Sequence, residues 1–79
     1  MPAEIAPWLA DALRRERGSK GWSQAEMARQ SGVDRSHLND LEAERRTPNI
    51  ETLEKLCKAL GMRLSALFRE AERRMDGER

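Results

Sequence analysis

Apolar residues recur along the chain at the spacing of one helix face, in five separate stretches. The fourth stretch is the clearest, because its apolar residues stand at the intervals i, i+3, i+4 and i+7 of a single face: Leu53, Leu56, Cys57 and Leu60. The first stretch repeats the pattern with Ile5, Trp8, Leu9, Ala12 and Leu13. Strand-forming residues are sparse, since Val occurs once and Tyr is absent. The pattern predicts an all-α protein of five helices.

Polar capping residues predict where four of these helices begin. The expected caps are Ser23, Asp34, Asn49 and Ser65. Ser23 is followed three residues later by Glu26, which is the pattern of a capping box. The last helix is expected over about residues 65–75.

The second and third helices are expected to lie very close together in sequence. Gly32 suits the left-handed conformation that ends a helix, and Asp34 begins the next helix almost at once. Two short helices joined by so tight a turn can meet at a steep angle. The sequence therefore predicts two short, closely joined helices over about residues 23–43.

The 79 residues allow one small domain, over residues 1–79, with no room for a second core. Hydrophobic residues make up 38% and charged residues 37%, which fits a compact helical domain with a solvated surface. A core of this size is only marginally stable, so pairing with a second copy of the chain would stabilise it.

The net charge of +1 counts mildly against nucleic-acid binding, because many such proteins carry a strong basic excess. Local charge matters more than the total. One basic stretch comprises Arg14, Arg15, Arg17 and Lys20, and Arg45 and Arg46 form a second. Taken alone, either run is typical of a solvated face.

The sequence does not support several classes of protein. The chain has one cysteine, Cys57, so an internal disulfide is excluded, and Cys57 is expected in the core. The chain also has no apolar run long enough for a signal peptide or a membrane span. Together, the missing disulfide and the missing apolar run favour the cytoplasm. A single histidine and a single cysteine make no metal cluster, and neither a phosphate-binding glycine loop nor a catalytic triad can be assembled. We therefore expect that the protein is not an enzyme, that it binds no metal and no cofactor, and that it does not contact a membrane.

One ordered set of residues carries a family resemblance over more than half of the chain. The set comprises Trp22, Ser23, Gln24, Ala28, Gly32 to Ser36, Leu38, Leu41, Glu42, Arg46, Pro48, Thr52, Leu53, Leu56, Ala59 to Gly61, Leu67 and Phe68. In these residues the chain resembles the lambda repressor/Cro-type helix-turn-helix family. The short chain and the run from Asp34 to Leu38 look most like controller proteins of restriction-modification systems.

The resemblance implies a five-helix lambda repressor-like domain that regulates transcription, as repressor or activator. Such a protein would bind a double-stranded DNA operator of two half-sites as a homodimer, and would regulate its own promoter. RNA polymerase is a further candidate partner. The alternative is an antitoxin, which would use the same fold to bind a toxin protein.

The resemblance and the docking geometry of this motif together imply a set of DNA contacts. They are Gln24 on a phosphate, Arg35 on a guanine, Ser36 and Asn39 on the groove-facing side, and Arg45 and Arg46 on the backbone. Two further residues stay open. His37 could contact a phosphate or a thymine methyl group, or stand as a plain surface histidine, and Asp40 could accept from cytosine or orient an arginine.

Three other features of the sequence are interpreted as structural: Glu42, Glu44 and an apolar group in the last helix. The family pairs Glu42 with an arginine of the first helix, which is Arg17 in an ungapped alignment and Arg14 if three residues are inserted near 18–20. Glu44 stands where the family often has glycine or asparagine, and its negative charge does not suit a phosphate contact. The last helix is expected to supply a group that is either core or dimer interface: Leu64, Leu67, Phe68 and Ala71.

Overall fold

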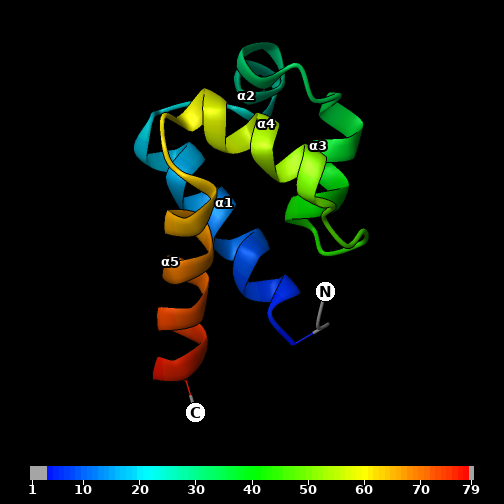
Figure 1. The fold of residues 1–79 in the computed structure, drawn as a ribbon. Coiled ribbons are helices and arrows are strands. Elements are labelled where there is room, and N and C mark those ends of the chain that lie inside the picture. Colours follow the sequence, from blue (N-terminus) through cyan, green and yellow to red (C-terminus); the bar gives the residue numbers. More distant parts are fainter. Residues whose placement is uncertain (1–3, 79) are drawn as a thin grey trace.

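The computed structural model describes residues 4–78, and Figure 1 shows how their helices are arranged. They are α1 (Ala6–Ser19), α2 (Gln24–Ser31), α3 (Arg35–Glu42), α4 (Ile50–Leu60) and α5 (Leu64–Gly77). No strand occurs within this described range. The prediction of an all-α protein with five helices is confirmed.

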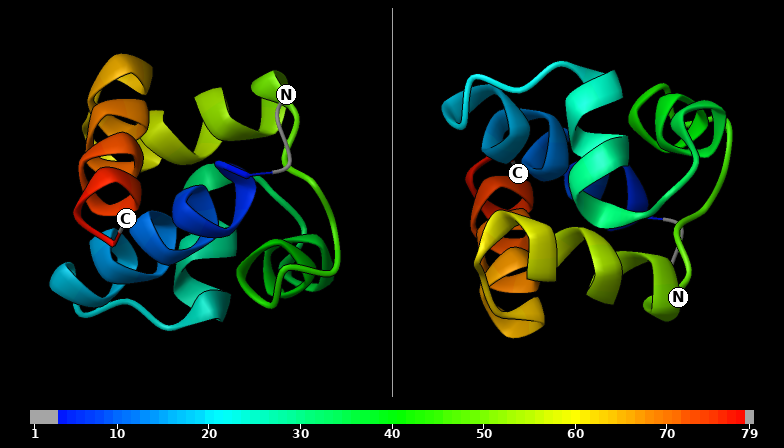
Figure 2. Two further views of the ribbon diagram at one scale, coloured as in Figure 1. Left: turned by 90° about the horizontal axis from the view of Figure 1, so that it is seen from below. Right: turned by 90° about the horizontal axis from the view of Figure 1, so that it is seen from above.

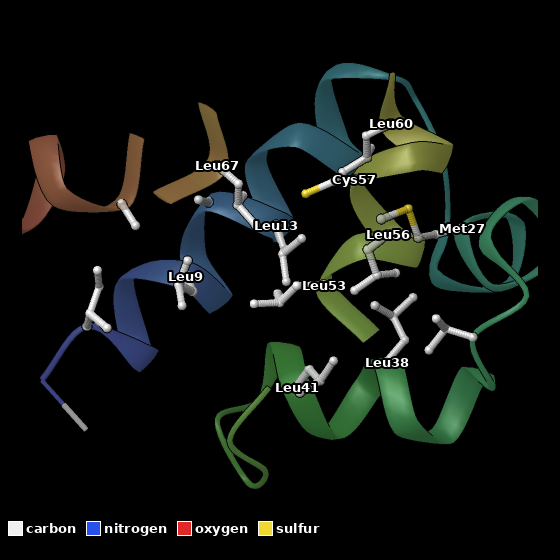
Figure 3. Close-up of a cluster of buried hydrophobic side chains, with 14 residues drawn as sticks. Leu9, Leu13, Met27, Leu38, Leu41, Leu53, Leu56, Cys57, Leu60 and Leu67 are labelled. Carbon is white, nitrogen blue, oxygen red and sulfur yellow. The ribbon is translucent and has the colours of Figure 1, made fainter. Parts of the chain in front are cut away.

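All five helices contribute to one hydrophobic core (Figure 3). Its largest fully buried side chains are Leu9, Leu13, Met27, Leu38, Leu41, Leu53, Leu56 and Leu67. Burying one leucine side chain stabilises the fold by about 1.5–3 kcal/mol, so these residues dominate the folding free energy. Cys57 is buried as predicted, at 2% exposed, and burial raises the pKa of its thiol.

Three of the four predicted caps are present at helix starts. The side chain of Ser23 accepts from the backbone N–H of Glu26 at 3.0 Å. Asp34 caps α3 by accepting from the N–H of Ser36 at 3.2 Å, and Asn49 caps α4 through the N–H of Thr52 at 2.8 Å. Each bond satisfies a backbone donor that the helix itself leaves unpaired.

The fourth predicted cap, Ser65, is wrong. Helix α5 begins at Leu64, with extended Arg63 at the cap position and no side-chain cap bond, so Ser65 lies in the first turn. The Arg63 carbonyl already accepts from the N–H of Ala66 and Leu67, which fixes the start two residues early.

Helices α1, α3 and α4 end with the same paired backbone hydrogen bonds. This closure needs one residue in the left-handed conformation. Gly21 (φ 73°) supplies it after α1 and Gly61 (φ 71°) after α4, whereas α3 uses Glu44 (φ 62°). In α3 the closing bond runs from the N–H of Arg45 to the carbonyl of Asp40, at 2.8 Å. Glu44, a residue with a Cβ, therefore adopts a backbone conformation that favours glycine.

Helices α2 and α3 are joined by residues 32–34 alone, and Gly32 (φ 77°) makes the turn. In both end-on views, α3 lies on the side of the bundle away from α5 (Figure 2). Helix α3 packs against α1 and α2, and on its outer side Arg35, Ser36 and Asn39 are exposed within the described residues.

Helices α1 and α5 lie side by side, and their contact decides part of the predicted dimer interface. Leu67 and Ala71 are 0% exposed within this single chain, so they offer no surface to a second copy. Of the two readings left open for this group, core or dimer interface, burial within the chain supports the core for Leu67 and Ala71. Leu64 and Phe68 are half-buried and keep part of their surface exposed.

Candidate nucleic-acid interface

An open depression lies where the start of α2 meets the start of α3. Its lining residues are Gln24, Asp34, Arg35, Ser36 and Asn39. Four of these are residues for which the sequence implied DNA contacts, although Gln24 belongs to a different helix from the others. The tight turn at Gly32 brings the two helix starts together.

The outer side of α3 presents free polar groups beside this depression. Arg35 and Asn39 are exposed, and within residues 4–78 their side chains form no hydrogen bond or ion pair. Asp34 accepts from the Ser36 hydroxyl as well as from its N–H, and these bonds lower the pKa of Asp34. The cap thus fixes the first turn, from which Arg35 projects into solvent.

Gln24 lies in the first turn of α2 and is half-buried. Its amide nitrogen donates to a carboxylate oxygen of Glu42 at 3.1 Å. The second N–H of the amide and the first-turn backbone N–H groups can still donate to an anion at this helix start. The bond to Glu42 was not predicted, because the two residues are 18 positions apart and meet only when the helices pack.

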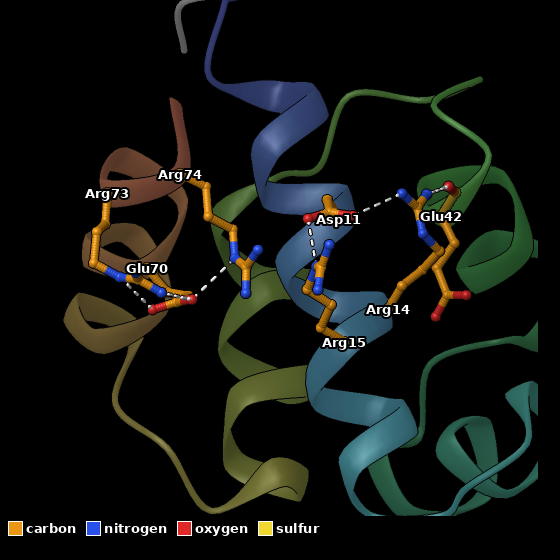
Figure 4. Close-up of polar contacts among 7 residues, drawn as sticks. All are labelled: Asp11, Arg14, Arg15, Glu42, Glu70, Arg73 and Arg74. Carbon is orange, nitrogen blue, oxygen red and sulfur yellow. Dashed lines mark hydrogen bonds and ion pairs between the residues drawn. The ribbon is translucent and has the colours of Figure 1, made fainter. Parts of the chain in front are cut away.

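Glu42 joins three helices at the inner end of this surface. Its side chain is 3% exposed, and it accepts from Nε and Nη2 of Arg17 at 2.8 Å each. These bonds raise the pKa of the Arg17 guanidinium. Arg14 also reaches Glu42, but donates to its main-chain carbonyl (Figure 4). Both arginines proposed by the alternative alignments thus contact Glu42, and Arg17 holds the carboxylate, as in the ungapped alignment.

The loop after α3 carries Arg45 and Arg46, both exposed. Asp40 holds them: its carboxylate lies 3.0 Å from Nη2 of Arg45 and 3.7 Å from Nη2 of Arg46. For Asp40, a contact with cytosine and the orientation of an arginine were both left open. The structure contains the contact between Asp40 and an arginine.

His37 is set apart from the other residues proposed to contact DNA. It is half-buried, does not line the depression, and its Nε2 atom is buried without a hydrogen-bond partner among the described residues. In this conformation Nε2 cannot reach a phosphate.

The arginines in the basic stretch from Arg14 to Lys20 are paired with carboxylates of the chain itself. Asp11 pairs with Arg14 at 3.2 Å and with Arg15 at 2.9 Å (Figure 4), while Arg17 is held by Glu42. Lys20 lies 5.9 Å from the ring centre of Trp22. Since its three arginines are paired within the chain, this stretch does not form an extended basic patch.

Residues 4–78 contain neither a candidate metal site nor a candidate membrane span. Histidine, cysteine and carboxylate side chains gather nowhere in groups of three or more that could hold a metal ion. Within the same range, each helix is too short or too polar to span a membrane.

Comparison with known proteins gives consistent matches. The helix-turn-helix family model HTH_3 matches residues 13–67. A hypothetical transcription factor of Neisseria meningitidis serogroup B is 37% identical over 67 residues, which are 85% of this chain and 63% of that protein. The chain spans 41–63% of the length of the first curated relatives that it matches.

Solved structures show the same arrangement of helices. The clp gene regulator ClgR from Corynebacterium glutamicum is 32% identical, with a TM-score of 0.86 over 94% of this chain and 79% of that one. The restriction-modification controller protein C.AhdI from Aeromonas hydrophila is also 32% identical, with a TM-score of 0.74 over 84% of this chain and 98% of that one.

Proposed function

The chain belongs to the helix-turn-helix family HTH_3, and we propose on this basis that it regulates transcription by binding a DNA operator as a homodimer. One observation carries the proposal. The turn at Gly32 gathers Gln24, Arg35, Ser36 and Asn39 around one open depression on the outer side of α3. The names of the relatives, which are transcription factors and gene regulators, support the same activity.

Helix α3 is the element proposed to read the base sequence. An α-helix fits the major groove of B-DNA, where each base pair shows a distinct pattern of donors and acceptors. Arg35 projects from the first turn of α3, which faces base edges in this docking geometry. Its guanidinium would donate two parallel hydrogen bonds to O6 and N7 of one guanine, while Ser36 and Asn39 would contact neighbouring positions.

Contacts with the phosphate backbone would fix the position of α3 in the groove. The start of α2 offers N–H groups and the amide of Gln24 on one side. Arg45 and Arg46 would contact phosphates from the loop at the other end of α3. These contacts carry no sequence information, and they make binding depend on salt because they release counterions.

The homodimer is proposed to use apolar surface at the start of α5. Met62, Leu64 and Phe68 pack on the core while remaining partly exposed. Two copies related by a two-fold axis would read two half-sites about one helical turn apart. Such pairing would also add buried surface to a small core.

The regulated promoter is proposed to be the chain's own. The likeness to the controller protein C.AhdI, almost all of which this chain covers, supports control of a restriction-modification system. Contact with RNA polymerase and action in the cytoplasm belong to the same proposal.

Selection of binding sites from random DNA tests the proposal. We expect an enriched sequence with two related halves, and a gel shift with that sequence and with the DNA upstream of the chain's own gene. A pull-down run beside it tests the antitoxin alternative. Failure to enrich any sequence, together with capture of a stoichiometric protein partner, would contradict DNA regulation.

A further inference from the structure

Asp40 faces the two arginines that are proposed to hold the DNA backbone. Nε of Arg45 donates to a carboxylate oxygen of Asp40 at 3.1 Å, and Nη2 of Arg45 lies 3.0 Å from the same oxygen. Arg46 approaches the other oxygen at 3.7 Å. One carboxylate therefore occupies the charged ends of both side chains in the free protein.

The turn that ends α3 creates this arrangement. The N–H of Arg45 donates to the carbonyl of Asp40, which folds the chain back over the last turn of the helix. Glu44 makes the reversal possible by adopting a positive φ. The backbone of Arg45 is thereby held beside Asp40, so the ion pairs follow from the fold rather than from a chance meeting of long side chains.

These ion pairs are accessible to solvent. The side chains of Arg45 and Arg46 are 58% and 54% exposed, and that of Asp40 is 33% exposed. A phosphate can therefore displace the carboxylate. An exposed ion pair contributes little to stability, so its main effect is on what the arginines can bind.

We propose that Asp40 is an internal competitor for the phosphates that Arg45 and Arg46 contact. The inference rests on the proposed function, since it concerns the same interface. To bind DNA, the two arginines exchange a carboxylate for a phosphate, and the displaced carboxylate stays close to the negative backbone. Asp40 thus limits how tightly the protein holds DNA of any sequence, and so limits the time spent on non-operator DNA.

The effect of Asp40 is independent of base sequence, because phosphates are the same at every step of the duplex. Arg35 lies at the other end of α3, in its first turn, while Asn39 is the neighbour of Asp40 in sequence. Neither side chain forms a hydrogen bond or ion pair with Asp40 among the described residues. Removing the carboxylate should therefore change the affinity for operator and for unrelated DNA by the same factor.

The test compares Asp40→Asn with wild type on the selected operator and on a scrambled duplex, each over a range of salt concentrations. We expect both affinities to rise roughly three- to tenfold at low salt, since two exposed ion pairs are removed. The slope of log affinity against log salt should steepen by about one, because the freed arginines release more counterions on binding. The ratio of operator to scrambled affinity should stay the same.

Asp11→Asn is the matched control. It removes the same charge from a carboxylate that also bridges two arginines, but on α1 and with Arg14 and Arg15 instead of Arg45 and Arg46. We expect the affinities of Asp11→Asn for both duplexes to change by no more than about twofold, because salt screens exposed charges that lie far from the DNA backbone. Circular dichroism and thermal melting establish that both variants are folded.

Any outcome other than these would overturn the inference about Asp40, each in its own way. Equal affinities and slopes for the two variants would remove any role of Asp40 in competition. Weaker binding of Asp40→Asn to every sequence would mean that the carboxylate orients the arginines for DNA, and a loss confined to one base pair would mean that it reads a base. Wild-type protein that binds no duplex would refute the proposed function, and this inference with it.

Discussion

Arg17 of α1 holds both carboxylate oxygens of Glu42 at the end of α3, through two hydrogen bonds of 2.8 Å each. The third nitrogen of Arg17 donates to the carbonyl of Trp22, just before α2. The same carboxylate accepts from Gln24 in α2. This pair therefore fixes how the two helices of the proposed interface sit on α1.

Removing one member of this pair should be strongly destabilising. Arg17→Met leaves the buried carboxylate of Glu42 with Gln24 as its remaining side-chain donor, and we expect a loss of roughly 2–4 kcal/mol in the free energy of unfolding. The double variant Arg17→Met/Glu42→Leu removes both charges and should recover most of that loss. Urea denaturation measures both. A double variant no more stable than Arg17→Met would contradict the explanation by an uncompensated charge.

Glu44→Gly should stabilise the protein. Glu44 holds a φ of 62°, a conformation that costs an L-residue about 1 kcal/mol and glycine almost nothing. We expect a gain on the order of 0.5–1 kcal/mol in urea denaturation. Glu44→Ala removes the charge but keeps the Cβ, so it should bring no comparable gain. Equal gains from both variants would show that charge, not backbone strain, is relieved.

Arg35→Ala should lose discrimination at one base pair in each half-site. A bidentate contact with guanine is worth roughly 1–3 kcal/mol of discrimination against other bases. Arg46→Ala should instead weaken all sequences alike and lower the salt slope. Competition against every single-base variant of the selected site measures both, with exposed Arg69→Ala on α5 as the control. A uniform loss for Arg35→Ala would make Arg35 a phosphate contact.

Sedimentation should show a dimer at micromolar concentration, and a charge at the start of α5 should weaken it. Leu64→Glu places a carboxylate on the half-exposed apolar surface and should raise the dimer dissociation constant at least roughly tenfold. Ser65→Glu, exposed in the same turn, is the matched control. A wild-type protein that stays monomeric both free and on DNA would refute the homodimer, and equal effects of the two variants would refute this interface.

Acid should weaken the cap of α3. The Ser36 hydroxyl and backbone N–H groups bond to Asp34 and hold its pKa below the usual value of 3.8. A lowered folded pKa means that the stabilisation is complete above about pH 4 and is lost as the pH falls through the lowered value. The melting-temperature difference between wild type and Asp34→Asn should therefore change in favour of the variant below pH 4. A difference that is constant from pH 6 to pH 2 would contradict this.

Local sequence signals predicted the fold well, because caps and apolar spacing act within a few residues. Ser23, Asp34 and Asn49 each need only an N–H two or three positions ahead. Ser65 failed because the closure of α4 at Gly61 leaves only two residues before α5 begins. Ser65 has the hydrogen-bonding properties of a cap, but these do not reveal how soon the next helix begins.

Contacts between helices were predicted less well. Periodicity identified Leu67 and Ala71 as one apolar face, but only the packing of α1 shows that the face is already covered. Asp40 meets two arginines because a left-handed residue reverses the chain between them. The family preference for glycine or asparagine at position 44 was the one sequence signal of that reversal.

The exposed side of α3 has a consequence for how such a protein can change over generations. The side chains of Arg35 and Asn39 form no hydrogen bond or ion pair with other parts of the described structure. The buried residues that hold α3 against the other helices are Leu38, Leu41 and Glu42. Surface substitutions of this kind usually alter stability by less than about 0.5 kcal/mol. With α3 as the proposed reading helix, operator preference could change by exchange at these two positions with no compensating mutation in the core. The same freedom would make this helix a practical scaffold for redirecting a regulator to a chosen site.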